Sequence, residues 1–269
     1  MAAQDSHDLT LYSGDRMNFD LKGRVAFVTG ATSGLGRHFA CVLSRAGVAV
    51  AITGRRVEKL TELEREINGE GGRCAAIPLD VTDASQIAPA FDTAETALGP
   101  VDILVNNAGM SINGPIANFT ASDFDKVVAT DLRAPFLLSQ EAGRRMIARK
   151  RGGKIINIAS ITASRVLPGS ALYCVSKAGL AMMTQCFARE WARYDINVNA
   201  ICPGFILTEL NREWFESEKG QAQIRSFPKR RTQKAEDLDG MLLLLASDAS
   251  RAITGALLDV DEGQSLSGL

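Results

Sequence analysis

Tyr173, Lys177 and Ser160 have the residue types and the spacing of a proton-transfer site. Residues four apart on a helix share one face, so the Lys177 ammonium would lie beside the Tyr173 phenol. A phenol ordinarily has a pKa of about 10, and a neighbouring cation favours the phenolate. Ser160, at the end of the preceding predicted strand, has a hydroxyl that suits a substrate oxygen. The three residues predict general acid–base chemistry on a carbonyl or an alcohol.

A plainer interpretation is that Tyr173 and Lys177 only stabilise an exposed helix. It explains neither the serine after the preceding strand nor a glycine-rich turn near the N-terminus. We therefore prefer the catalytic interpretation. Ser164 and Ser170 are alternatives to Ser160 as the hydroxyl donor, although neither follows directly on the strand.

The glycine-rich turn is Thr29-Gly-Ala-Thr-Ser-Gly-Leu-Gly36, between a predicted strand and a predicted helix. Glycine lets the backbone approach a pyrophosphate closely, and the helix N-terminus offers unpaired N–H groups and a partial positive charge. Three glycines could also make a tight connection and nothing more. Beside the proton-transfer residues, however, they predict a dinucleotide site. Its expected contacts are Gly30, Thr32, Ser33, Gly34, Leu35 and Gly36.

The choice of nicotinamide cofactor depends on Thr53-Gly-Arg-Arg56, about twenty residues after the turn. NAD-specific folds place an acid at the end of the second strand, and NADP-specific folds place an arginine nearby. Gly54 occupies the place of the acid, and the guanidinium of Arg55 suits a 2′-phosphate. Arg55 and Arg56 could instead be a solvated helix start, although basic charge there opposes the helix dipole. NADP(H) is the expected cofactor and NAD the alternative.

Short apolar runs alternate with helix-period stretches and must position these residues. The runs are 24–29, 48–53, 74–79, 101–105, 154–159, 196–201 and 256–260. The helical stretches are 34–46, 56–68, 83–98, 121–150, 170–193 and 235–247. This alternation predicts an α/β, single-domain Rossmann fold, with a doubly wound seven-stranded parallel sheet and helices on both faces. Right-handed crossovers place the ligand site at the carboxyl ends of the strands.

Two segments do not follow this alternation. Residues 1–18 are polar and without periodicity, which predicts a flexible N-terminal extension before one domain over 19–269. Residues 204–232 mix apolar and charged groups over a length that is unusual for a loop inside a domain. We expect them to form a substrate loop with a short helix near 209–218.

Composition excludes several classes of function. Lys and Arg number 30 against 31 Asp and Glu, so no net field favours nucleic acid or a membrane surface. The apolar runs are too short to cross a bilayer, and 1–18 do not resemble a signal peptide, so a cytoplasmic location is expected. Five scattered cysteines and two histidines predict neither a disulfide framework nor a metal site.

The order and spacing of these motifs, together with Asn106-Asn-Ala-Gly109, resemble the short-chain dehydrogenase/reductases from Phe19 to Gln264. Members of the 3-oxoacyl-carrier-protein reductase and gluconate 5-dehydrogenase types are most similar. The resemblance implies an enzyme of class EC 1.1.1 that interconverts a carbonyl and a secondary alcohol by hydride transfer. Tyr173 would be the general acid/base, assisted by Lys177 and Ser160. A non-catalytic nucleotide-binding scaffold of the same fold remains the alternative.

The resemblance also assigns residues to the cofactor and the substrate. Asp80 and Val81 would border the adenine, although Asp80 could be an ordinary acid at a helix start. Lys177 and Tyr173 would lie beside the nicotinamide ribose. The other implied cofactor contacts are Asn106, Asn107, Ala108, Gly109, Pro203, Gly204, Ile206 and Thr208. The implied contacts of a small carbonyl or alcohol substrate are Ser160, Thr162, Tyr173 and Phe205.

Two positions depart from the family pattern. Asp131 stands where asparagine is usual, a residue that helps to hold a water beside the lysine, largely through its backbone carbonyl. An extra carboxylate there would partly cancel the charge of Lys177 acting on Tyr173, so we count Asp131 among the catalytic residues. Val260-Asp-Glu-Gly263 replaces the usual Asp-Gly-Gly and is expected to affect a turn or a subunit contact.

The helical stretches 121–150 and 170–193 carry more apolar positions than one core-facing stripe requires. Family members commonly bury such faces between subunits. The resemblance therefore implies a homo-oligomer, either a tetramer or a dimer.

Overall fold

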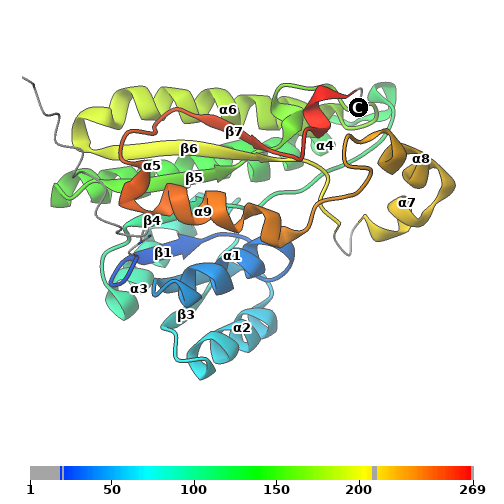
Figure 1. The fold of residues 1–269 in the computed structure, drawn as a ribbon. Coiled ribbons are helices and arrows are strands. Elements are labelled where there is room, and N and C mark those ends of the chain that lie inside the picture. The colour runs from blue at the N-terminus through cyan, green and yellow to red at the C-terminus, as the bar shows by residue number, and fades with distance from the viewer. Residues whose placement is uncertain (1–18, 20, 208–210, 268–269) are drawn as a thin grey trace, which may run out of the picture.

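One parallel sheet organises the chain, whose computed structural model describes residues 19, 21–207 and 211–267. The predicted extension, 1–18, lies outside the described residues. The strand order is β3-β2-β1-β4-β5-β6-β7 (Figure 1), and every pairing is parallel. The strands are β1 (Val25–Val28), β2 (Ala49–Gly54), β3 (Cys74–Pro78), β4 (Ile103–Asn106), β5 (Gly153–Ile158), β6 (Ile196–Pro203) and β7 (Leu257–Val260). The predicted seven-stranded doubly wound sheet is confirmed.

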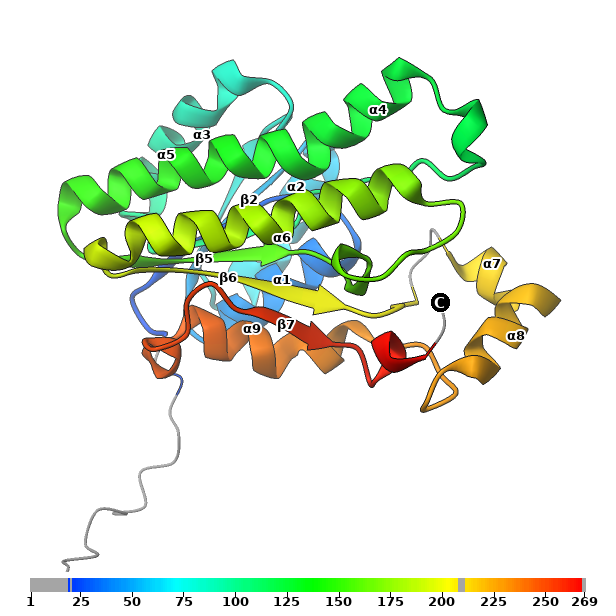
Figure 2. The same cartoon turned by 90° about the horizontal axis from the view of Figure 1, so that it is seen from above.

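Helices cover both faces of this sheet (Figure 2). They are α1 (Gly34–Arg45), α2 (Val57–Gly69), α3 (Ala84–Leu98), α4 (Ala121–Val128), α5 (Ala134–Arg149), α6 (Ala171–Trp191), α7 (Arg212–Glu216), α8 (Glu218–Ser226) and α9 (Asp239–Ala246). One apolar core joins the sheet to α3, α5 and α6, and the other joins it to α1, α2 and α9. No helix among the described residues combines the length and the apolar character needed to cross a bilayer.

The alternation of side chains along β1 shows how the sheet supplies both cores. Val25 and Phe27 pack against the helices of one face, and Ala26 and Val28 pack against those of the other. Successive side chains of a strand point to opposite faces, so a strand that is apolar at every position is suited to burial on both. This is why the short apolar runs indicated a covered parallel sheet.

The helix predicted over 121–150 is interrupted, so that prediction is wrong in its continuity. A π-helical turn, Ala129–Arg133, separates α4 from α5. Pro135 has no N–H to donate to the carbonyl of Asp131 four residues earlier, so regular α-helical bonding cannot continue through this point. Single π-helical turns inside helices are frequent at functional sites. This one contains Asp131.

The segment 204–232 contains more helix than the single short helix predicted near 209–218. α7 and α8 follow each other with Ser217 between them. The extended backbone of Ser217 ends α7, and its hydroxyl accepts a hydrogen bond from Gly220 N at 3.1 Å, which caps α8. Figures 1 and 2 both show the two helices beyond the carboxyl ends of the strands. We call residues 204–232 the helical lobe.

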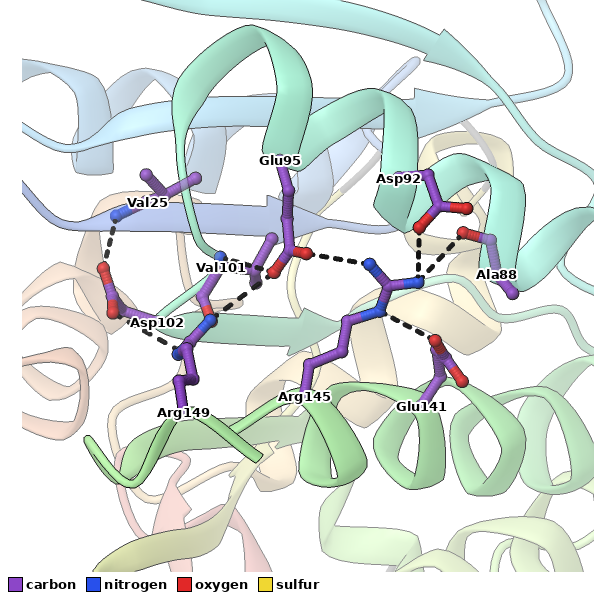
Figure 3. Close-up of polar contacts among 9 residues, drawn as sticks. All are labelled: Val25, Ala88, Asp92, Glu95, Val101, Asp102, Glu141, Arg145 and Arg149. Carbon is purple, nitrogen blue, oxygen red and sulfur yellow. Dashed lines mark hydrogen bonds and ion pairs between the residues drawn. The ribbon is translucent and has the colours of Figure 1, made fainter. Parts of the chain in front are cut away.

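An ion-pair network joins α3 and α5 at the opposite end of the sheet (Figure 3). Arg145 donates to Glu141 and Asp92 at 2.7 Å and to Glu95 at 2.8 Å. Arg149 donates to the Val101 carbonyl, and Asp102 accepts from Val25 N at 3.1 Å. The carboxylates raise the pKa of Arg145 although burial acts against this. The network fastens α3 and α5 to the starts of β1 and β4.

Replacing Arg145 with Met is expected to lower the free energy of unfolding by about 1–3 kcal/mol, because hydrogen bonds to charged groups are lost and carboxylates are left unpaired. The side chains of Glu95 and Glu141 are only 25% and 17% exposed, so solvent cannot fully replace the guanidinium. Arg144→Met is the matched control, since Arg144 is 67% exposed and 3.7 Å from Glu141. Urea unfolding measures both variants, and equal losses would contradict a special role for Arg145.

Candidate active site

The carboxyl ends of four strands bring the predicted site segments together. The glycine-rich turn follows β1, Asn107 follows β4, Ser160 follows β5 and Gly204 follows β6. β1 lies between β2 and β4 in the sheet, so the chain connections diverge at this point. In doubly wound sheets, ligands bind in the crevice outside such a divergence.

Lys177 belongs to α6, and its side chain is buried between this helix and the sheet, with 4% of its surface exposed. Its Nζ donates to the Ile158 carbonyl at 3.0 Å and lies 5.3 Å from the centre of the Tyr173 ring. Burial alone would lower the pKa of Lys177, but the charges of Tyr173 and Asp131 outweigh burial and raise it. The structure therefore places the Lys177 ammonium over the face of the phenol.

Asp131 is fully buried and pairs with this lysine. Its Oδ2 lies 3.3 Å from Lys177 Nζ, and its Oδ1 accepts a hydrogen bond from Met110 N at 2.8 Å. Burial raises the pKa of Asp131, whereas the Lys177 charge and the Met110 N–H both favour the carboxylate. A Cβ on Gly109 would come within 3.2 Å of Oδ2. The absence of a side chain at Gly109 leaves room above the ion pair.

The three candidate serines differ in what their hydroxyls do. Ser164 Oγ donates to the Ile161 carbonyl at 3.4 Å, and Ser170 Oγ donates to Asn113 Oδ1 at 3.0 Å. Ser160 Oγ instead accepts a hydrogen bond from Thr162 N at 3.1 Å. Among the described residues none accepts the Ser160 hydroxyl proton, which stays available for a substrate oxygen. This geometry favours Ser160 over its two alternatives.

Cys202 is a neighbour of the site that the sequence did not single out. It lies in β6, and burial raises the pKa of its thiol to about 12. The thiol therefore stays protonated beside the Ser160 backbone and adds no nucleophile, because the reactive form of cysteine is the thiolate.

Asn107 and Thr29 brace the glycine-rich turn. Asn107 Nδ2 donates to the Thr29 carbonyl at 2.9 Å, and Thr29 Oγ1 accepts from Asn107 N and Ala108 N, both at 3.0 Å. A Cβ on Gly36 would lie 2.3 Å from the Gly30 carbonyl oxygen, so only glycine permits this close packing. Thr29 was missing from the predicted residues because its bracing depends on a contact across the sheet.

The first turn of α1 has the features of an anion site. Ser33 precedes the helix, yet its side chain does not cap it, and the first turn contains no acidic residue. The N–H groups at this end therefore carry the partial positive charge of a helix N-terminus without local compensation.

Asp80 forms a turn of its own in the loop that follows β3. Its Oδ1 accepts from Thr82 N at 3.0 Å and from Thr82 Oγ1 at 2.7 Å. These hydrogen bonds, and more weakly the charge of Arg55, hold the pKa of Asp80 below its usual range. Asp83 rather than Asp80 caps α3, so Asp80 is not the helix-start acid considered as an alternative. The Val81 side chain packs in the core beside α3.

Two glutamines without a recognisable motif hold the start of the helical lobe. Gln233 Oε1 accepts from Gly204 N at 3.0 Å, and Gln264 Oε1 accepts from Phe205 N at 2.7 Å. The Phe205 ring stacks on Phe227 at 5.4 Å between centroids and meets Phe215 edge-on at 5.9 Å. Phe205 thus also holds the lobe together.

The contacts described above do not explain the roles predicted for Thr162, Ile206 and Thr208. Ile206 is 7% exposed and packs in the core on the side of α9. Thr162 is 5% exposed, with a hydroxyl that has no partner among the described residues. Thr208 lies outside the described residues.

The second departure from the family pattern has a structural consequence. Glu262 has a left-handed backbone, with φ of +55°, at a position where glycine would be unstrained. Its carboxylate pairs with Lys229 at 3.3 Å and with Arg231. This turn therefore ties the C-terminal segment to the end of the helical lobe.

Comparisons with known proteins agree with this geometry. A family model described as enoyl-(acyl carrier protein) reductase matches residues 30–265. The chain is 34% identical over 250 residues to gluconate 5-dehydrogenase of Gluconobacter oxydans, covering 93% of this chain and 97% of that protein. It is 34% identical to a 3-oxoacyl-[acyl-carrier-protein] reductase of Thermotoga maritima, covering 90% and 98%.

A solved structure extends the likeness to three dimensions. Gluconate 5-dehydrogenase from Burkholderia cenocepacia, in complex with NADP and tartrate, superimposes with a TM-score of 0.89 at 35% identity. The match covers 93% of this chain and 98% of that one. The family match over most of the chain and the shared sheet identify this chain as a member of the short-chain dehydrogenase/reductases, a family of NAD(P)-dependent oxidoreductases.

Proposed function

We propose that the protein is an NADP(H)-dependent oxidoreductase that interconverts a carbonyl and a secondary alcohol. The observation that supports this most strongly is the buried Lys177 ammonium 5.3 Å from the centre of the Tyr173 ring. A cation at this position favours loss of the phenol proton. An exposed helix pair with a merely stabilising role would not need a lysine that is only 4% exposed.

Each residue of the site has a part in moving the proton. When bound, the nicotinamide cofactor supplies or accepts the hydride. In reduction, Tyr173 donates its hydroxyl proton to the substrate oxygen, and in oxidation the phenolate removes it. Ser160 donates a hydrogen bond to the same oxygen and stabilises developing negative charge. Lys177 stabilises the phenolate and, with the cofactor bound, would donate to its ribose hydroxyls.

The glycine-rich turn and its neighbours fit a dinucleotide. The uncapped first turn of α1 offers N–H groups to a pyrophosphate. The predicted contacts of the adenine side are Arg55, Arg56, Asp80 and Val81. On the nicotinamide side they are Asn107, Ala108 and Gly109, followed by Pro203, Gly204, Ile206 and Thr208.

Gly54 and the cofactor bound by solved relatives both favour NADP(H) over NAD. Gly54 offers no carboxylate to a ribose diol, and Arg55 beside it suits a 2′-phosphate. Besides the Burkholderia cenocepacia enzyme, a dehydrogenase from Agrobacterium tumefaciens has been solved with bound NADP. We infer NADP(H) for this chain, with NAD as the alternative.

Replacing Arg55 with Ala is expected to weaken NADPH binding about tenfold, because one charged hydrogen-bond donor to the 2′-phosphate is lost. NADH binding should stay as in the wild type. Fluorescence titration of both cofactors measures this, with Arg65→Ala on α2 as the control for a lost exposed arginine. Tighter NADH than NADPH binding by the wild type would reverse the cofactor assignment. Binding of neither would remove the oxidoreductase proposal.

A homo-oligomer is the second part of the proposal. Between α5 and α6 lies an apolar groove, whose lining residues include Leu132, Phe136, Met182 and Phe187. Phe136 and Met182 are 40% and 61% exposed and lie in the same groove, and contiguous exposed apolar patches mark interaction sites. We propose that a second copy of the chain covers this face, giving a dimer or a tetramer.

A cytoplasmic location is also proposed, since all five cysteines are free thiols.

A further inference from the structure

Lys177 and Asp131 form a buried ion pair whose two charges cancel. Lys177 Nζ lies 3.3 Å from Asp131 Oδ2, and the two residues are 4% and 0% exposed. Apart from this ion pair, Oδ2 has no polar partner among the described residues. The carboxylate therefore acts on the ammonium alone, and water does not screen the two charges.

The surroundings of Asp131 suit the ionised form of its side chain. Oδ1 accepts a hydrogen bond from Met110 N at 2.8 Å, and Oδ2 faces the Lys177 ammonium. Both oxygens thus face hydrogen-bond donors, and a proton on Oδ2 would find no acceptor in the part of the chain that the structure describes. Asp131 therefore brings a negative charge to the site.

Gly109 leaves both charges close to the surface that is predicted to face the cofactor. A Cβ on this residue would lie 3.2 Å from Asp131 Oδ2 and 3.5 Å from Lys177 Nζ. Gly109 follows β4, in the segment predicted to contact the nicotinamide side of the cofactor. A group that binds over Gly109 therefore meets the field of both charges, with no side chain of this residue in between.

Hydride transfer requires the nicotinamide ring at this end of the site. In alcohol oxidation the substrate loses a hydride from a carbon and a proton from the oxygen bonded to that carbon. The proton passes to the Tyr173 phenolate, and the centre of this ring is 5.3 Å from Lys177 Nζ. The hydride acceptor must therefore lie near Tyr173. The acceptor ring is cationic only when oxidised, so Lys177 repels it and Asp131 attracts it in that form alone.

We propose that Asp131 sets the relative affinity of the site for the two oxidation states of the cofactor. Its carboxylate cancels the repulsion between Lys177 and the cationic ring. NADP⁺ then binds more tightly, relative to NADPH, than it would beside an ammonium alone. The protein thereby accepts the oxidised cofactor that alcohol oxidation requires, while Lys177 keeps its charge for Tyr173. The proposal rests on the proposed function, because it requires a nicotinamide cofactor over Gly109.

Calorimetric titration with NADP⁺ and with NADPH isolates this effect, because the two ligands differ only in the oxidation state of the ring. Two unit charges about 10 Å apart, at an effective dielectric constant of about 20, change a dissociation constant about tenfold. Asp131→Asn is therefore expected to raise the ratio of the NADP⁺ to the NADPH dissociation constant about tenfold. Asp125→Asn, an exposed acid on α4, should leave this ratio unchanged. Binding is the readout because the carboxylate also influences the rate through Tyr173.

The double variant Lys177→Met/Asp131→Asn distinguishes charge from packing. It removes both charges and keeps side chains of similar length, so the ratio of the two dissociation constants should return to the wild-type value. Loss of the Lys177 contact with the ribose weakens both cofactors alike, because both oxidation states have the same ribose. A ratio that stays raised in the double variant would mean that asparagine acts through packing, which would overturn the proposal.

The outcomes separate this inference from the proposed function. A wild type that binds neither NADP⁺ nor NADPH contradicts the proposed function itself. A wild type that binds both, with a ratio that Asp131→Asn leaves unchanged or lowers, contradicts only the role of Asp131. Should Asp131→Asn melt at a much lower temperature because Lys177 has lost its partner, Lys177→Met is compared with the double variant at mildly alkaline pH. The double variant should then have the higher ratio, and equal ratios would overturn the proposal.

Discussion

Tyr173→Phe is expected to lower kcat for carbonyl reduction by about 10²–10⁴-fold, the range that a positioned general acid contributes. The phenyl ring keeps the packing against Lys177, so NADPH binding should change little. Only the proton donor is lost, and the alkoxide left by hydride transfer then has no positioned partner. Steady-state rates with a panel of carbonyl substrates, beside NADPH titration of the same preparations, measure the two effects separately.

Tyr194→Phe is the control for this prediction. Tyr194 ends the helical segment that includes α6 and stacks with Arg193, away from the carboxyl ends of the strands. Its variant should retain the wild-type kcat. A Tyr173→Phe protein with more than a tenth of the wild-type kcat would contradict the assignment of Tyr173 as the acid. A wild type that binds NADPH yet reduces none of the carbonyls would favour the alternative of a non-catalytic scaffold.

The fold was predictable because the strands are short and mainly apolar and alternate with helix-period stretches. The run that contains β1 indicated a strand buried on both faces, and the pattern of its side chains in the two cores explains why. The location of the site residues at the ends of the strands was predictable for the same reason. Ser160 and the glycine-rich turn come directly after apolar runs, and parallel strands bring their carboxyl ends to one edge of a sheet.

What the sequence could not reveal depends on contacts between distant segments. Gln233 and Gln264 hold Gly204 and Phe205, but neither belongs to a motif. The hydrogen bond from Arg56 to Ser33 joins the ends of two connections that leave neighbouring strands. Side-chain contacts of this kind are set by tertiary packing, which leaves no periodic signal in the chain. The π-helical turn at Asp131 was predictable only in part, since Pro135 marks an interruption of the helix without specifying its geometry.

Asp131→Asn is expected to move the limb of the pH–rate profile for alcohol oxidation to lower pH. Oxidation needs the Tyr173 phenolate, and the Lys177 ammonium favours it. The Asp131 carboxylate, 3.3 Å from Lys177, adds a negative charge that opposes the phenolate and so places the wild-type limb at higher pH. Asparagine keeps the size and the acceptor for Met110 N but removes that charge. At a pH below the wild-type limb, oxidation by the variant should be faster than oxidation by the wild type.

Loss of the Asp131 carboxylate also acts on the pKa of Lys177, and this effect opposes the expected shift of the pH–rate limb. The charge of Asp131 helps to raise the pKa of Lys177, so its removal lets burial lower that pKa. The charge of Tyr173 also raises it, and Lys177 keeps its bond to Ile158, so the ammonium should persist wherever the phenolate forms. Asp125→Asn, an exposed acid on α4, is the control and should leave the profile unchanged. Superimposable profiles for the wild type and Asp131→Asn would show that the carboxylate does not act on Tyr173, whereas a limb at higher pH would show that it chiefly keeps Lys177 protonated.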